Sequence, residues 1–132
     1  MLKYMLDTNI VIYTLKKMPA SVRAAFKKHD GRMGISSIHC MELGYDAERS
    51  SNPERTLTSL EGLFARMDVL PLGDLAAVHT GQIRAGLAKL GMSNGLYDQL
   101  IAGHARSLGL VTNNKKEFSL VSGLRLQNLV SQ

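Results

Sequence analysis

Short, mostly apolar segments alternate along the chain with longer segments in which apolar residues recur at helical spacing. The short segments are flanked by polar or turn residues, which is typical of buried strands. Pro71 has no backbone N–H to donate to a neighbouring strand, so the third short segment should lie at a sheet edge or end there. We predict strands at residues 2–6, 32–35, 68–72 and 110–112, and a further short strand around 124–126.

Residues that start and stop helices bound the longer segments. Ser36 and Ser37 are suited to cap one helix and Asp74 another, because their side-chain oxygens accept hydrogen bonds from free backbone N–H groups. We predict helices at residues 8–17 and 20–29, after Ser37 through residue 47, from Pro53 through residue 67, at 74–90 and at 97–108, with a turn and a short helix at 113–118. Strands that alternate with helices in this way predict a parallel α/β sandwich rather than an all-helical bundle.

The length and composition fit a single domain spanning residues 1–132, large enough to bury a core without disulfides or a structural metal. Cys40 is the single cysteine and cannot form an internal disulfide, so we expect a reducing cytoplasm as the compartment and no catalytic thiol. Asp7 and Asn9 interrupt the apolar start of the chain, which argues against an export signal. No run approaches the roughly 18 apolar residues that cross a bilayer, so we expect no membrane partner.

The chain carries 16 Lys and Arg against 11 Asp and Glu, a formal net charge of +5. A positive field of this kind favours an anionic partner, of which nucleic acid is the first candidate. A generally basic surface explains the charge about as well. Arg84, Lys89, Arg106, Lys115 and Lys116 could line an approach for phosphates, and each is equally compatible with a solvated surface.

Asp7 stands where the first predicted strand ends and a helix begins. In open parallel sheets, ligands bind just outside the carboxyl ends of the strands, so an aspartate there is a candidate metal ligand. The simpler alternative is that Asp7 or Thr8 caps the following helix. Other parts of the chain favour the ligand.

Further polar residues follow the other predicted strands or lie on the helices after them, and the parallel topology should bring them to the same sheet edge. Clustered carboxylates repel one another and persist only if protonation or a cation neutralises them. Oxygen ligands without His or Cys suit Mg²⁺ or Mn²⁺ better than Zn²⁺. The predicted set consists of Asp7, Glu42, Asp98, the Thr112-Asn113-Asn114 turn and Glu117.

Four blocks in this order resemble the PIN-domain ribonucleases of the VapC toxin type. They are Met5-Leu6-Asp7-Thr8-Asn9-Ile10, Ile35-Ser36-Ser37 with Met41-Glu42-Leu43, Asp98-Gln99-Leu100-Ile101-Ala102-Gly103-His104-Ala105, and Val111-Thr112-Asn113-Asn114 with Glu117-Phe118. The likeness covers nearly the whole chain. It implies a PIN-like three-layer α/β/α sandwich with a short, mainly parallel central sheet.

The resemblance also implies roles for these residues. Asp7, Glu42 and Asp98 correspond to the acidic metal ligands of the family, and Thr8 to a hydroxyl that steadies the first carboxylate. Asn114 or Glu117 would occupy a fourth, more variable position, and Thr112 would help to orient the substrate. The implied cofactor is Mg²⁺, with Mn²⁺ able to substitute, and the implied reaction is endonucleolytic cleavage of RNA.

The family likeness further implies the partners. We expect tRNA as the RNA substrate, with initiator tRNA the first to test, a VapB-type antitoxin that blocks the site, operator DNA bound only through the antitoxin complex, and a homodimer. The alternative is a catalytically weak binding partner that acts mainly as a corepressor with its antitoxin. A phosphatase with an aspartyl nucleophile is disfavoured by Asn9, where a second carboxylate would be needed.

The histidines have simpler expected roles. His104 lies well past Asp98 on its predicted helix and should pack or support structure, and the same holds for His79. His39 is close to Glu42 on one helix, and we expect a partly exposed histidine in the capping turn. The chain has neither an aromatic platform for stacking bases nor a glycine-rich phosphate loop.

Overall fold

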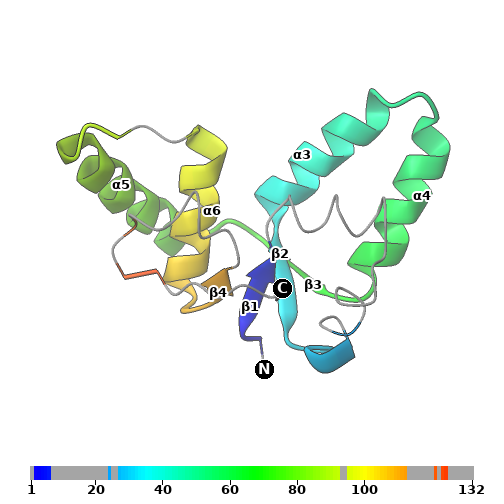
Figure 1. Cartoon of the computed structure of the whole chain (residues 1–132), viewed down its shortest axis with the longest axis horizontal. Helices are drawn as coiled ribbons and strands as arrows, with labels where there is room; N and C mark the ends of the chain where they lie inside the picture. Colours follow the sequence, from blue (N-terminus) through cyan, green and yellow to red (C-terminus); the bar gives the residue numbers. More distant parts are fainter. Residues whose placement is uncertain are drawn as a thin grey trace.

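The computed structural model describes residues 2–6, 24, 27–92, 95–112, 121 and 123–124. Within them, one pair of helices follows the second strand and another pair follows the third (Figure 1). The elements are β1 (Tyr4–Leu6), β2 (Met33–Ser36), α3 (Ser37–Glu48), α4 (Pro53–Phe64), β3 (Asp68–Leu70), α5 (Asp74–Lys89), α6 (Leu96–Ser107) and β4 (Val111–Thr112).

The four described strands form one parallel sheet in the order β3-β2-β1-β4. β1 pairs with β2 on one side, where Leu6 lies opposite Ile35, and with β4 on the other, where Met5 lies opposite Thr112. The strand order reverses between β1 and β4, and such a switch point is where open α/β sheets bind their ligands. The carboxyl end of β1 therefore lies where sheet topology favours a site.

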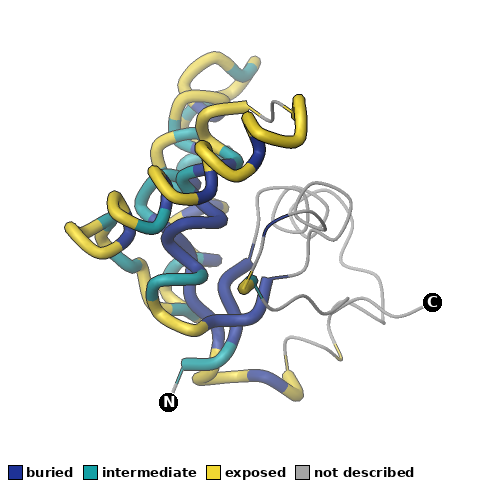
Figure 2. Tube along the Cα trace, turned by 90° about the vertical axis from the view of Figure 1, so that its left-hand side faces the viewer, coloured by how far each residue is buried: buried dark blue, intermediate teal, exposed yellow. Residues whose placement is uncertain are grey.

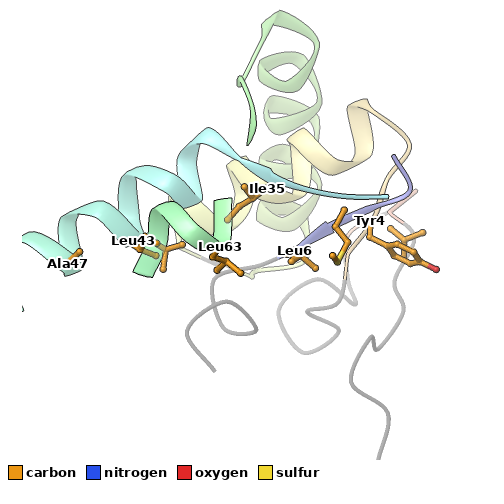
Figure 3. Close-up of a cluster of buried hydrophobic side chains, with 9 residues drawn as sticks. Tyr4, Leu6, Ile35, Leu43, Ala47 and Leu63 are labelled. Carbon is orange, nitrogen blue, oxygen red and sulfur yellow. The ribbon is translucent and has the colours of Figure 1, made fainter. Parts of the chain in front are cut away.

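The sheet separates two apolar clusters, because successive side chains of a strand point to opposite faces. Tyr4 and Leu6 pack with α3 and α4, as Figure 3 shows for Leu6, Leu43 and Leu63. Met5 packs on the other face with α5 and α6, for example against Ile83 and Ile101. In Figure 1 the two helix pairs flank the strands on opposite sides. The described residues thus form the expected α/β/α sandwich.

Burial along the strands follows this arrangement. β1, β2 and β4 are buried at every position, whereas β3 is mostly exposed. Figure 2 shows buried segments in the interior and exposed turns on the outer sides of the helices. The prediction that the strand with Pro71 lies at an edge is confirmed, since β3 ends at Leu70 and has a single neighbour in the described sheet. All four internal strands were predicted within one or two residues of their observed bounds.

The helix boundaries agree with the sequence at most positions. Ser36 caps α3, its hydroxyl accepting a hydrogen bond from the Ile38 N–H at 3.1 Å, and α4 begins at Pro53. The prediction that Asp74 caps α5 is wrong. Gly73 occupies the cap position without a side-chain hydrogen bond, and Asp74 is the first helical residue. At this position its carboxylate still interacts favourably with the positive end of the helix dipole.

Several predicted elements lie outside the described residues. They are the helix at 8–17, most of the helix at 20–29, and the turn and short helix at 113–118. Lys27 and Lys28 are helical, and Gly31 follows with a positive φ of 76°, in agreement with a helix that stops at Asp30-Gly31. Leu124 is not in a strand, and the rest of the predicted tail strand is not described. No helix in the described part of the chain is long and apolar enough to cross a membrane.

Helices α5 and α6 approach each other closely at Gly103. A Cβ atom built on Gly103 would overlap the Thr80 hydroxyl and come within 2.8 Å of the Thr80 backbone nitrogen. Thr80 cannot turn away freely, because its hydroxyl donates a hydrogen bond of 2.7 Å to the Ala76 carbonyl. Gly103 therefore sets the spacing between the helix that carries Asp98 and its neighbour.

Replacing Gly103 with alanine should destabilise the fold by about 1 to 3 kcal/mol, the usual cost of forcing a methyl group into a packed contact. Gly86→Ala on α5 is the matched control, because a Cβ there meets nothing within 4 Å. That control should be neutral or stabilising by up to about 1 kcal/mol, as alanine favours the helix. Urea denaturation of both variants measures the difference, and equal stabilities would show that the helices are not in close contact at Gly103.

Candidate active site

Two of the predicted acidic residues lie within reach of each other's charge. Glu42 is in the second turn of α3 and Asp98 in the first turn of α6, and both side chains are half-buried. Burial raises the pKa of the Glu42 carboxyl, and the negative charge of Asp98 raises it further. The fold thus brings together carboxylates that are 56 residues apart in the sequence, and it holds them in a place where a cation would relieve their repulsion.

Asp46 is a third acidic residue, near Glu42, and it was not among the residues predicted from the sequence. It lies four residues after Glu42 on α3, and its charge also raises the pKa of the Glu42 carboxyl. Residues four apart on a helix are neighbours, so the spacing itself was the available signal. Asp46 is exposed, whereas Glu42 is half-buried.

Thr112 ends β4 and is fully buried. Its hydroxyl makes no hydrogen bond within the described residues, which is unusual because buried polar groups are almost always paired. Thr112 lies opposite Met5, two residues before Asp7 in the sequence. An unsatisfied hydroxyl at the carboxyl ends of these strands fits a site that receives a polar ligand.

The remaining predicted site residues, Asp7, Thr8, Asn114 and Glu117, lie outside the described residues. Asp7 directly follows Leu6 of β1, and Asn114 comes two residues after Thr112 of β4. Among the residues that the structure does describe, no three His, Cys, Asp or Glu side chains are grouped closely enough to hold a metal ion. The described acidic donors are therefore Glu42 and Asp98. Asp7, the predicted third acidic ligand, follows β1 in the sequence, and β1 lies between β2 and β4 in the sheet.

His104 fixes the helix that carries Asp98 against the start of α3. Its Nδ1 atom is 2.8 Å from the Ser36 hydroxyl, and its ring also meets the Pro71 backbone. Proline has no backbone N–H, so the Pro71 carbonyl accepts from Nε2–H and Nδ1 accepts from the Ser36 hydroxyl. Burial lowers the pKa of His104, which keeps the ring neutral as this arrangement requires. The expected structural role of His104 is confirmed.

The expectation that His39 is partly exposed is wrong. Only 3% of His39 is exposed, on the face of α3 that also buries Leu43 and Ala47. Burial lowers its pKa to about 4, against the opposing effect of a hydrogen bond with the Leu6 backbone. The helix period places residue 39 on the core-facing side together with residues 43 and 47, and this pattern outweighed its position in the first turn.

His79 and Arg106 join α5 to α6 at the side of the molecule. Arg106 Nε donates to His79 Nδ1 at 2.8 Å, and its Nη2 donates to the Gln82 side-chain oxygen at 2.5 Å. His79 thus has the packing role that the sequence predicted. Because Arg106 makes these hydrogen bonds within the protein, it is a poorer candidate for a phosphate contact than the exposed Arg84 or Lys89.

Cys40 is a free, half-buried cysteine on α3. Burial raises the pKa of its thiol, so the reactive thiolate is disfavoured.

Comparisons with known proteins show strong similarity over nearly the whole chain. A family profile described as the PIN domain matches residues 4–124. A tRNA(fMet)-specific endonuclease VapC of Shigella flexneri is 57% identical over 130 residues, which cover 97% of this chain and 98% of that protein. A ribonuclease VapC2 of Haemophilus influenzae is 46% identical over 132 residues, covering 98% of this chain and 100% of that protein.

A solved structure supports the same relationship. The chain superposes on one from DNA-bound VapBC of Salmonella typhimurium with a TM-score of 0.93 and 51% sequence identity, covering 98% of this chain and 99% of that one. At this level of similarity the agreement extends from the sequence to the arrangement of the elements.

Replacing Glu42 with glutamine should stabilise the metal-free protein at neutral pH by up to about 1 kcal/mol after solvent screening. The folded-state pKa of Glu42 lies above its ordinary value of 4.5, so ionisation destabilises the fold as pH rises through that range. The gain should therefore be present at pH 7 and vanish below pH 4.5. Thermal denaturation against pH measures it, and a variant less stable than the wild type at pH 7 would contradict the proposed repulsion.

The buried histidines should make stability depend on pH between 6.5 and about 4. The pKa of both His39 and His104 is lowered from 6.5, to about 4 for His39, so acid drives unfolding as the unfolded chain takes up protons that the folded chain excludes. His39→Gln should reduce this slope by at most about 1.4 kcal/mol per pH unit. Urea denaturation across the window tests this, and parallel wild-type and variant curves would contradict it.

Proposed function

Because this chain belongs to the PIN-domain family and, within it, to the VapC ribonucleases, we propose that it is an endoribonuclease toxin whose substrate is initiator tRNA. The VapC relative of Shigella flexneri carries that specificity in its name, and it matches this chain over nearly its full length. An RNA substrate of this kind implies that the protein acts in the cytoplasm.

The observation that carries the proposal is the approach of Glu42 to Asp98. Two half-buried carboxylates from different helices repel each other, which raises the pKa of Glu42 and would be relieved by a bound cation. Such an arrangement is typical of functional sites, where perturbed carboxyl groups cluster. The chain as a whole carries a formal net charge of +5, which suits attraction of an RNA backbone.

PIN-domain ribonucleases are metal-dependent in general. We propose Mg²⁺ as the cofactor here, with Mn²⁺ able to substitute, because the donors are carboxylate oxygens without a histidine or cysteine ligand. Asp7, Glu42 and Asp98 would hold the ion, and Glu117 or Asn114 would contribute a fourth position. When bound, the ion would neutralise these carboxylates and activate water for attack on the phosphodiester.

The residues of this chain contribute to catalysis mainly by holding the metal ligands and the substrate in position, and less by acting as general acids or bases. α3 and α6 hold Glu42 and Asp98, and the Ser36–His104 hydrogen bond keeps the two helices in register. Thr8 would steady the Asp7 carboxylate. The Thr112 hydroxyl, which is buried without a hydrogen bond in the described part of the chain, would help to orient the substrate. Precise placement of reacting groups is a major source of rate enhancement.

The structural neighbours also suggest the partners. The Salmonella typhimurium structure is a DNA-bound VapBC complex, and a VapBC2 structure of Rickettsia felis, 30% identical with a TM-score of 0.91, is bound to a DNA fragment from its promoter. We propose that this chain likewise pairs with a VapB-type antitoxin, that it meets operator DNA only through that complex, and that it forms a homodimer.

Replacing Asp98 with asparagine should reduce cleavage of initiator tRNA by at least about 100-fold, because the amide keeps the shape of the side chain and removes its charge. Asp7→Asn should have the same effect, and EDTA should stop the wild type. Asp30→Asn, an exposed aspartate in the turn before β2, is the matched control and should cleave normally. Gel assays with a synthetic tRNA measure the rates, with binding of the antitoxin as the test of folding.

The ends of the products distinguish the chemical routes. Attack by activated water leaves 5′-phosphate and 3′-hydroxyl ends, whereas attack by the RNA 2′-hydroxyl leaves a cyclic phosphate, and sequencing of the ends separates them. Unchanged cleavage by a clean Asp98→Asn preparation would show that Asp98 is not a metal ligand. No cleavage by the wild type with Mg²⁺ or Mn²⁺ would favour the alternative, a binding partner that acts mainly as a corepressor.

A further inference from the structure

His39 is a buried polar residue for which the proposed chemistry has no role. It lies in the first turn of α3, three residues before Glu42, and is only 3% exposed. Burying an imidazole costs free energy unless the ring forms hydrogen bonds. An apolar side chain at this position, beside Leu43 on the same face, would pack without that cost. The polar group at residue 39 therefore needs an explanation.

The ring of His39 forms a hydrogen bond with the backbone of Leu6. This bond favours the protonated ring, as a carbonyl acceptor does, so a ring N–H donates to the Leu6 carbonyl. Leu6 is the last residue of β1, and the next residue in the chain is Asp7. The bond thus links the end of β1, which Asp7 follows in the sequence, to the first turn of α3, which precedes Glu42.

We propose that His39 is a positioning residue for the metal site, holding the end of β1 at a fixed separation from α3 and thereby aligning Asp7 with Glu42. This inference rests on the proposed function, in which both carboxylates bind the same cation. The partners that orient metal ligands affect affinity strongly although they do not touch the metal.

The chemistry of imidazole suits this position. The ring is neutral at neutral pH, because burial lowers its pKa to about 4 and the nearby His104 disfavours a second charge. A neutral donor can bond a carbonyl without adding a positive charge that would compete with the cation. Lysine or arginine in the same place would weaken the site by charge repulsion.

A second buried histidine offers a matched control. His29 is 8% exposed, and its ring lies 4.4 Å from the ring of Tyr4, the first residue of β1. His29 and His39 thus contact opposite ends of the same strand, and only the end at Leu6 leads to the site. A purely structural effect should be similar for both.

The test uses full-length wild type, His39→Phe, His39→Gln and His29→Phe. Phenylalanine keeps a ring and removes the donor, whereas glutamine keeps an N–H donor. Binding of Mn²⁺ alone, followed by electron paramagnetic resonance, should weaken about tenfold in His39→Phe. The kcat for initiator tRNA should fall with little change in KM. His39→Gln should recover most of both losses, and His29→Phe should retain wild-type Mn²⁺ affinity even where its thermal stability drops.

The outcomes separate this inference from the proposed function. If the wild type binds Mn²⁺ and cleaves, but His39→Phe does so equally well or loses no more than His29→Phe, His39 has no positioning role. If His39→Gln binds Mn²⁺ no better than His39→Phe, the hydrogen-bond donor has no role. If His39→Phe does not fold, His39→Gln is compared with the wild type, and a roughly tenfold loss of Mn²⁺ affinity in His39→Gln would overturn the inference. A wild type that neither binds Mn²⁺ nor cleaves would overturn the proposed function and this inference with it.

Discussion

The Ser36 hydroxyl is the contact on which the geometry of the site depends most. It accepts from the Ile38 N–H to begin α3 and donates to His104 on α6, so a single buried atom joins the two helices that carry Glu42 and Asp98. Both bonds are uncharged and shielded from water, which makes them insensitive to salt and costly to break. Two like charges can be held near each other only because such neutral contacts resist their separation.

The site and the core therefore make opposite demands on stability. Apolar clusters on both faces of the sheet stabilise the fold, whereas the repulsion between Glu42 and Asp98 and the buried Thr112 hydroxyl, which has no hydrogen bond within the described residues, each cost stability. Strain of this kind is common where a protein is organised to receive a ligand. At the carboxyl end of β4 this cost falls on Thr112, while at the amino end of β1 the rings of Tyr4 and His29 pack against each other.

Local patterns in the sequence were sufficient to predict the described strands, the cap at Ser36 and the edge position of β3. They were also sufficient to pair Glu42 with Asp98, because parallel topology brings strand ends together. Local patterns failed where two signals competed: Asp74 is a good cap by type, yet Gly73 takes that position, and His39 is polar, yet helical phase buries it. The tertiary contacts of His39 with Leu6 and of His104 with Ser36 join distant segments and have no local signature.

The tight approach at Gly103 also limits how the protein can respond to a substrate. With no space between Gly103 and the Thr80 backbone, α6 cannot slide or roll over α5 without a steric clash. Packed interfaces of this kind move as units and do not deform continuously. The wall of the site that carries Asp98 is therefore pre-organised, and α5 and α6 should respond to a bound RNA as a single unit.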